Sequence, residues 1–244
     1  VRLAYKVLHQ ALEKAVKLEY ISRNPAAGCE LPRLEQKEIH PLEDQQVAAL
    51  LRAVKGGRLE LLVSIALFTG LRQSELLGLT WDCVDFQKGT LLVNKQLSRI
   101  LHREESGLFL SPKSGKSRTI TPAPSVLRTL KEQRRQLKAG SLWNNAHNLV
   151  FTNETGGPLE QWRVEKDYQA AVEAVGLAGA RFHDLRHTYA VNAIRAGDDI
   201  KTIQGNLGHA SAAFTLDRYG HFTERMRQDS AARMEGFIKG VLGL

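Results

Sequence analysis

The spacing of apolar residues along the chain predicts helices first. Within residues 3–20, apolar side chains recur at the spacing of one helix face: Leu8, Ala11, Leu12 and Ala15. Asn24-Pro25 and Leu31-Pro32 would break that helix. Residues 30–38 are charged and aperiodic, which indicates a linker, and we expect a new domain to begin near residue 41.

The next apolar segments predict the core of this new domain. A helix led by Glu43-Asp44 places four apolar residues on one face: Val47, Leu50, Leu51 and Val54. Residues 61–68 are almost wholly apolar, so we expect that helix to lie at the centre of the core. Gly70 interrupts it, and Arg72 follows at once.

Shorter alternating segments follow. Residues 83–97 predict a strand, a turn at 87–89 and a second strand, and residues 107–121 predict another hairpin around 114–116. Helices are expected at about 124–138 and 160–175, with a short extended piece at 148–152. From residue 183 onward the pattern is helical. The predicted fold is therefore mainly α with a small antiparallel β-sheet, of the α+β class.

Composition narrows the class of protein. The 244 residues carry a net charge of +8, which favours a polyanionic partner such as nucleic acid. Cys29 and Cys83 are isolated, which disfavours a disulfide framework or a cysteine-based zinc site and fits a reducing compartment. No apolar run approaches the roughly 20 residues that span a membrane. Because the chain begins at Val1 inside a helical pattern, we expect a fragment that lacks its natural N-terminal part.

Short polar blocks carry the candidate chemistry. The planar fork of Arg72 suits two phosphate oxygens, and Glu75 could orient it; taken alone, however, the residue fits a surface arginine paired with Glu75 better. His183 and Arg186 share a helix face, with Asp184 as a candidate cap at a helix start that favours anions. A structural histidine and a solvated arginine remain the alternative.

Two further blocks complete the set. Tyr219 lies ten residues after His209, between Arg218 and His221, and its phenol needs a base or a cationic site to become nucleophilic. Lys113 lies in a cation-rich segment, residues 111–118, at a predicted hairpin tip, which is either a solvated loop or a turn that delivers an ammonium. Together these side chains could hold a phosphodiester and attack it with a phenol, without a metal.

Five segments, in this order, resemble the catalytic domain of tyrosine recombinases, in particular the integrases of temperate phages and conjugative transposons. They are residues 69–79, 112–120, 182–190, 207–209 and 215–221. Residues 3–32 resemble the last helices of the core-binding domain that precedes it. The expected domains are therefore residues 1–34, the end of a truncated core-binding domain plus linker, and residues 35–244, a catalytic domain with a C-terminal exchange tail.

The resemblance implies a role for each candidate residue. Tyr219 would be the nucleophile, Arg72 and Arg186 would hold the nonbridging phosphate oxygens, and His183 would accept the tyrosine proton. Lys113 would protonate the leaving 5′ oxygen, and His209 would hydrogen-bond the phosphate. The implied enzyme needs no metal and no nucleotide cofactor. It is a site-specific DNA recombinase that forms a 3′-phosphotyrosine intermediate and integrates or excises a mobile element.

The resemblance also implies partners and leaves alternatives open. The partner of the protein would be double-stranded DNA at specific recombination sites in the bacterial cytoplasm. A tetramer would assemble on that DNA through the C-terminal tail. The tail, residues 224–242, carries an apolar stripe that could instead pack on its own domain. The stripe consists of Met226, Ala231, Met234, Phe237, Ile238, Val241 and Leu242. The alternatives are DNA relaxation of the type IB topoisomerase kind and a non-cleaving DNA-binding protein of the same fold.

Two places depart from the family's usual pattern. Gly205-Asn206 stands where helix formers are more common, and Phe214 stands where a small polar residue is common. Because glycine costs about 1 kcal/mol in a helix interior, the first could loosen its turn. We expect neither to contact the candidate catalytic residues.

Overall fold

The computed structural model describes residues 1–32, 39–98, 107–113, 115–139, 145–219 and 224–242, without the side chains of residues 139, 224–229 and 233. The chain divides into two compact units, Val1–Glu38 and Ile39–Leu244. Part of the predicted linker, together with Ser114 and His221, lies outside the described residues.

The first unit contains α1 (Arg2–Lys17), which matches the helix predicted from residue 3 but ends before residue 20. The hydroxyl of Tyr5 donates to the carbonyl of Ala26, and the side chain of Asn24 donates to the carbonyl of His9. These contacts hold the segment after the helix against it. Assignment of this unit to a core-binding domain stays a prediction.

In the second unit, α2 (Asp44–Val54), α3 (Glu60–Thr69) and α4 (Gln73–Leu77) follow one another. Most of α3 is buried, as its apolar run predicted. It ends at Gly70, whose φ of 65° is left-handed, and a Cβ there would lie 2.3 Å from the ring of Tyr189. Glycine therefore permits both the turn and the close packing that lead the chain into Arg72.

The strands form two small antiparallel sheets after a 3-10 turn at Trp81–Cys83. One has the order β1 (Val84–Asp85), β2 (Thr90–Val93), β5 (Arg118–Ile120), and the other pairs β3 (Gln96–Leu97) with β4 (Phe109–Leu110). Of the strand, turn and strand expected at 83–97, β1, the turn and β2 are confirmed, but residues 96–97 form a further strand that belongs to the other sheet.

The hairpin expected at residues 107–121 is wrong. Its two strands pair with different partners, because β4 lies on β3 whereas Ile120 of β5 lies opposite Leu91 of β2. Both Ile120 and Leu91 are buried in the main core. Strand pairing here thus follows the burial of the inward side chains. A turn-forming sequence between two strands is not enough to make them pair with each other.

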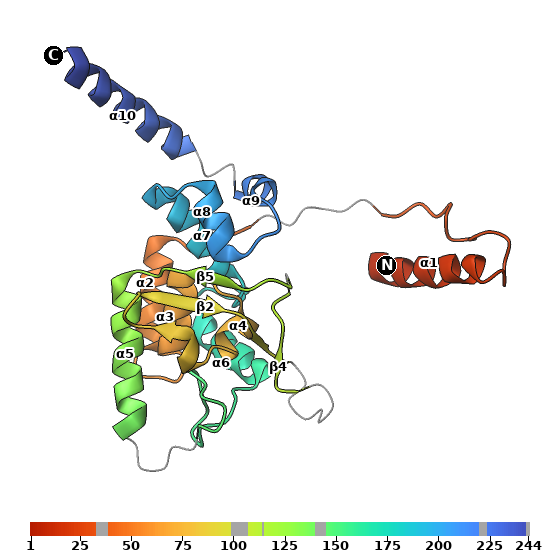
Figure 1. Cartoon of the computed structure of the whole chain (residues 1–244), viewed down its shortest axis with the longest axis horizontal. Helices are drawn as coiled ribbons and strands as arrows, with labels where there is room; N and C mark the ends of the chain where they lie inside the picture. Colours follow the sequence, from red (N-terminus) through yellow and green to blue (C-terminus); the bar gives the residue numbers. More distant parts are fainter. Residues whose placement is uncertain (33–38, 99–106, 114, 140–144, 220–223, 243–244) are drawn as a thin grey trace. The chain divides into compact units, whose positions relative to one another are not determined.

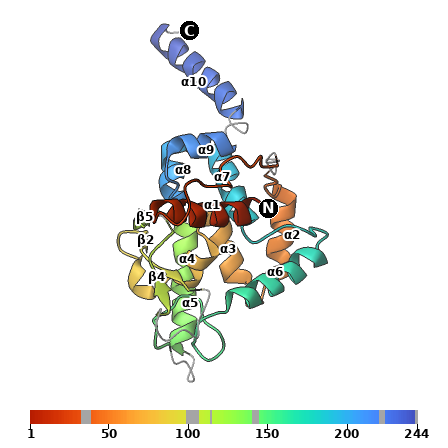
Figure 2. The same ribbon diagram turned by 90° about the vertical axis from the view of Figure 1, so that its right-hand side faces the viewer.

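The remaining helices are α5 (Pro124–Ala139), α6 (Gln161–Ala174), α7 (Asp184–Ala196), α8 (Ile200–Leu207), α9 (Ala212–Tyr219) and α10 (Glu224–Leu242). Between α5 and α6, the predicted extended piece forms isolated bridges at Leu149 and Thr152. In both views α7, α8 and α9 gather at one end of the unit, beside β5 (Figure 1, Figure 2). The fold class predicted from the sequence is confirmed.

These three helices share a core of their own, separate from the cluster around α3. Its buried residues are Ala190, Val191, Ala193, Ile194, Ile203, Leu207 and Tyr219. The candidate nucleophile is therefore part of a packed interior. Among the described helices, none is long and apolar enough to cross a membrane.

Candidate active site

Arg72 is held by a buried carboxylate. It immediately precedes α4, and the Glu75 side chain accepts hydrogen bonds from its backbone nitrogen at 2.9 Å and from Nη1 at 2.8 Å. The Glu75 side chain is fully buried, whereas that of Arg72 remains 21% exposed. The orientation proposed for Glu75 is thus observed, and Arg72 retains a face that a ligand can reach.

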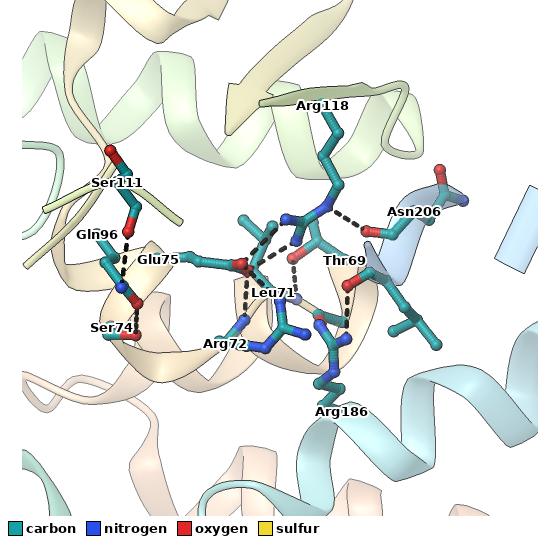
Figure 3. A network of polar contacts seen from close by, with 12 residues as sticks. Thr69, Leu71, Arg72, Ser74, Glu75, Gln96, Ser111, Arg118, Arg186 and Asn206 are labelled. Atoms are coloured by element: carbon teal, nitrogen blue, oxygen red, sulfur yellow. Dashed lines mark hydrogen bonds and ion pairs between the residues drawn. The ribbon is translucent and has the colours of Figure 1, made fainter. Parts of the chain in front are cut away.

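Glu75 also binds a second arginine, Arg118, which was not predicted to lie at this site. Arg118 donates to the two carboxylate oxygens at 2.9 and 2.7 Å, and its Nε donates to the carbonyl of Asn206 at 2.9 Å (Figure 3). Burial alone would raise the pKa of Glu75, but the hydrogen bonds and charge of Arg118, together with Arg72, lower it to about 2. Arg118 lies in β5 rather than in a solvated turn, so it links the sheet to α4 and α8.

Arg186 is the most deeply placed cation of the group, with 3% of its surface exposed. Its Nη1 donates to the carbonyl of Gly70 at 2.7 Å, and its Nη2 donates to the carbonyl of Leu207. Burial, and then the charge of Arg72, lower its pKa to about 9, so it stays charged at neutral pH. Two guanidinium groups thus bind the Glu75 carboxylate, and the third, that of Arg186, lies near its charge. This excess of positive charge suits a phosphate.

Tyr219 ends α9 and is only 1% exposed. Its hydroxyl lies 2.6 Å from Nδ1 of His187, and burial raises its pKa to about 12. Burial, and then His183, lower the pKa of His187 to about 4, so this imidazole is neutral at pH 7. A neutral Nδ1 can accept the phenol proton.

This contact differs from the one expected for His183. His183 is exposed at the start of α7, and its ring packs edge-on against His187 with centroids 5.0 Å apart. His187 was not predicted from the sequence, although its spacing from His183 places both on one face of α7. Asp184 is not the expected cap, because its carboxylate accepts from the backbone and side chain of Arg181, ahead of the helix.

His209 also packs against the candidate nucleophile. Its ring stacks on that of Tyr219, with centroids 6.4 Å apart and an interplanar angle of 10°, and its Nδ1 lies 2.9 Å from the Thr215 hydroxyl. Burial, and then Arg186, lower the pKa of His209 to about 3. It can therefore act as a neutral hydrogen-bonding group.

Of the two departures from the family pattern, Phe214 contacts a candidate catalytic residue, contrary to expectation, whereas Asn206 contacts Arg118, which was not among the candidates. Phe214 packs edge-on against His209 with centroids 5.0 Å apart, and the Asn206 carbonyl accepts from Arg118. Gly205 lies in an unbroken α8. The reason is the close packing of α8 and α9, which turns positions near their ends toward the cluster.

Lys113 is exposed on the segment that joins β4 to β5. The structure thus gathers Arg72, Arg186, His209 and Tyr219 around buried polar contacts, with His183 at the edge. In the part of the chain that the structure describes, no group of three or more histidine, cysteine, aspartate or glutamate side chains could hold a metal.

Comparison with known proteins decides the family. Residues 40–226 match the family model described as the phage integrase family. The chain belongs to this family. Phage integrase family members are tyrosine recombinases, enzymes that cut and rejoin DNA strands, as the resemblance implied.

Two relatives illustrate the range of the family. The chain is 32% identical to a XerC-like tyrosine recombinase of Caldanaerobacter subterraneus subsp. tengcongensis, over 88% of this chain and 60% of that protein. It is 25% identical to an integrase of Saccharopolyspora erythraea, over 97% of this chain and 66% of that protein. The chain therefore spans less than two thirds of the length of these curated relatives.

Solved structures share the fold. An integrase of the transposon Tn1549, in complex with a circular intermediate DNA, superposes with a TM-score of 0.77 at 23% identity, over 96% of this chain and 78% of that chain. A lambda integrase dimer bound to a COC′ core site superposes with a TM-score of 0.63 at 20% identity, over 87% of this chain and 72% of that chain. The integrase fold predicted from the motifs is confirmed.

Proposed function

We propose that this chain carries the catalytic part of a site-specific DNA recombinase, which cuts and rejoins strands during integration or excision of a mobile element in the bacterial cytoplasm. The observation that carries this proposal is the buried Tyr219 hydroxyl, 2.6 Å from a neutral His187 and close to the charge of Arg186. A phenol, a proton acceptor and fixed guanidinium groups are the parts that phosphodiester attack requires.

In the proposed cleavage step, Arg72 and Arg186 hold the nonbridging oxygens while the Tyr219 oxygen forms a bond to phosphorus. The bond from phosphorus to the 5′ oxygen breaks, and Lys113 gives that oxygen a proton. The phenol proton passes to a histidine, which is His187 in the observed geometry and His183 in the role that the resemblance implies. Attack by a 5′-hydroxyl of another duplex then releases Tyr219.

Access of the phosphate to Tyr219 requires a shift of α9. Tyr219 is buried, with its ring packed near those of His187 and His209, and burial raises its pKa to about 12, which opposes loss of the proton. The nearby charges of Arg186 and Arg218 act in the opposite direction. Movement toward the arginines and the phosphate would therefore favour the nucleophilic form.

The two alternatives predict different products. A relaxing topoisomerase would rejoin the same strand, whereas a recombinase transfers it to a partner duplex. The similar proteins are named recombinases and integrases, which favours strand transfer over relaxation. The presence of Arg72, Lys113, His183, Arg186, His209 and Tyr219 disfavours a non-cleaving DNA-binding protein.

A nicked suicide substrate tests the proposed cleavage. The duplex carries the end of the mobile element that surrounds the gene, with a nick that releases the strand after cleavage so that rejoining is prevented. We expect a covalent protein–DNA adduct on a denaturing gel, formed in EDTA and without ATP, with a free 5′-hydroxyl on the released strand. DNA binding with no adduct on any end of the element would contradict the proposal.

We further propose that the chain assembles as a tetramer on DNA, with its tail docked on a neighbouring subunit. The support is the last part of α10, where large apolar side chains are exposed, led by Phe237 at 67%. The others are Met234, Ile238, Val241 and Leu242. Full burial of one such side chain contributes roughly 1.5–3 kcal/mol, so docking on a partner surface that covers these side chains would stabilise the assembly.

Deletion of residues 235–244 should leave the melting temperature of the chain almost unchanged, because these side chains are not packed on their own unit. It should abolish cooperative assembly and strand exchange on paired sites, as measured by gel shift and by recombinant products. Phe237→Ser with Val241→Ser is a milder test of the same surface. A large loss of thermal stability with assembly intact would show that the tail belongs to its own core.

A further inference from the structure

The proposed reaction needs Arg72 and Lys113 in a fixed relation, although they lie on different elements. Arg72 precedes α4, and Lys113 lies on the segment between β4 and β5. Gln96, in β3, connects these two places. The Ser74 hydroxyl donates to its Oε1 at 3.0 Å, and its Nε2 donates to the Ser111 carbonyl at 2.8 Å (Figure 3).

The backbone of Gln96 is fixed on both sides, so its side chain can connect α4 to the segment that carries Lys113. It pairs with Leu110 of β4 in antiparallel register. On its other side it lies against the end of α4 at Gly78, where a Cβ would be 2.6 Å from the Leu97 nitrogen and 2.8 Å from the Gln96 carbonyl carbon. Only glycine at residue 78 permits this approach, so β3 is seated directly on α4.

The orientation of the Gln96 amide is also determined. The Ser111 carbonyl can only accept, so the NH2 side of the amide must face it. The oxygen then faces the Ser74 hydroxyl, which can donate. A carboxylate at this position could still accept from the Ser74 hydroxyl but could not donate to the Ser111 carbonyl. An apolar side chain could make neither hydrogen bond.

Both partners of Gln96 lie two residues from a proposed catalytic side chain. Ser74 follows Arg72 by two positions, and Ser111 precedes Lys113 by two. Between Ser111 and Lys113 stands Pro112, which is buried and whose ring fixes φ near −65°. The location of the Ser111 carbonyl therefore limits where the backbone of Lys113 can begin.

We propose that Gln96 is a positioning residue that sets Lys113 relative to Arg72 by bridging Ser74 and Ser111. This rests on the proposed function, in which Lys113 protonates the leaving 5′ oxygen. Loss of the bridge leaves the arginine cluster intact, because Glu75, Arg118 and Arg186 have their own contacts. The defect should therefore be confined to protonation of the leaving group.

A substrate with sulfur at the 5′-bridging position distinguishes this role from a general structural one. A thiolate leaves without a proton, so a defect in the general acid disappears on that substrate, whereas a defect in phosphate binding persists. General acid catalysis contributes about 10²–10⁴-fold, so a displaced acid should lose a measurable part of it. Single-turnover cleavage of otherwise identical oxygen and sulfur suicide substrates gives the two rates.

We expect Gln96→Leu to cleave the oxygen substrate at least about tenfold more slowly than the parent chain and the sulfur substrate at nearly the parent rate. Gln96→Glu retains an acceptor for Ser74 but has no donor for Ser111, so it should show the same pattern of rates as Gln96→Leu. It replaces the leucine variant in the test if that variant folds poorly. Lys113→Ala defines full loss of the acid. Gln161→Leu is the matched control, because Gln161 donates to Gln73 of α4 at 2.8 Å and does not reach Ser111; any slowing should be equal on both substrates.

The outcomes separate the two levels of the proposal. If Lys113→Ala is rescued by sulfur and the Gln96 variants are slowed equally on both substrates, or not at all, Gln96 is not a positioning residue although the general acid is correct. If Lys113→Ala is not rescued, Lys113 is not the general acid, and the role proposed for Gln96 fails with it.

Discussion

Tyr219→Phe should lose all covalent adduct on the suicide substrate while binding DNA about as well as the parent chain. Phenylalanine retains the ring that stacks on His209 in the core of α7, α8 and α9. What it removes is the hydroxyl 2.6 Å from His187, which is the proposed attacking atom. Without a nucleophile no bond to phosphorus can form, so the expected effect is complete rather than partial.

The same substitution should have a modest effect on stability. It leaves Nδ1 of His187 without the phenol, and an unsatisfied buried polar group costs about 1–3 kcal/mol. Thermal unfolding therefore has to accompany the cleavage assay. Tyr189→Phe is the matched control, because its hydroxyl also has a partner in the same region, the Asn206 amide at 3.0 Å.

The control variant should still form the adduct, since Tyr189 has no proposed chemical role. Denaturing gels of the parent chain and both variants, at equal fractions of bound DNA, provide the comparison. Adduct formation by Tyr219→Phe would remove Tyr219 from the proposed mechanism. Loss of adduct by both variants would indicate that the packing of this region, rather than the phenol oxygen, limits cleavage.

Glu75→Gln should give the largest loss of stability of any single change in the arginine cluster. The carboxylate is fully buried and binds Arg72 and Arg118, with the charge of Arg186 close by. Removing one partner of a buried ion pair costs about 3–5 kcal/mol, because the remaining charges are left uncompensated. At about 2–4 °C per kcal/mol for a chain of this size, the melting temperature should fall by roughly 6–20 °C.

The acid limb of the stability curve should change as well. The pKa of Glu75 is lowered from 4.5 to about 2 on folding, so its ionised form stabilises the fold above pH 4.5, and this contribution is lost as pH falls toward 2. The difference corresponds to about 3 kcal/mol. Glu75→Gln should therefore lower the free energy of unfolding at neutral pH and flatten its dependence between pH 4.5 and pH 2.

Glu132→Gln is the control for this prediction. The pKa of Glu132 is also lowered to about 2, by hydrogen bonds from Arg135 and Gln136, but the carboxylate is on the surface. Exposed ion pairs contribute little, so the melting temperature should hardly move. Urea unfolding of the three proteins from pH 2 to pH 7 measures the difference, and equal stability of Glu75→Gln and the parent chain would show that the cluster does not depend on this charge.

The motifs identified the family because they combine local signals that need no knowledge of the fold. A Gly-Leu-Arg turn after an apolar helix, a histidine and an arginine three residues apart, and a tyrosine in a polar context each follow from a few adjacent residues. The helices α2, α3, α5 and α6 were likewise predictable, since their apolar periodicity is local. The same reasoning failed for β4 and β5, which are close in sequence but belong to different sheets.

What the sequence determined by itself is the fold class, the family, and Arg72, Arg186 and Tyr219 as candidate site residues. Only the tertiary structure decided their contacts. His183 and His187 share one face of α7, and the packing of α9 against α7 places the Tyr219 hydroxyl on His187. Arg118 and Gln96 are unremarkable in a strand pattern, because their partners Glu75 and Ser111 are brought near by folding rather than by spacing. Such contacts depend on long-range burial, which no local pattern encodes.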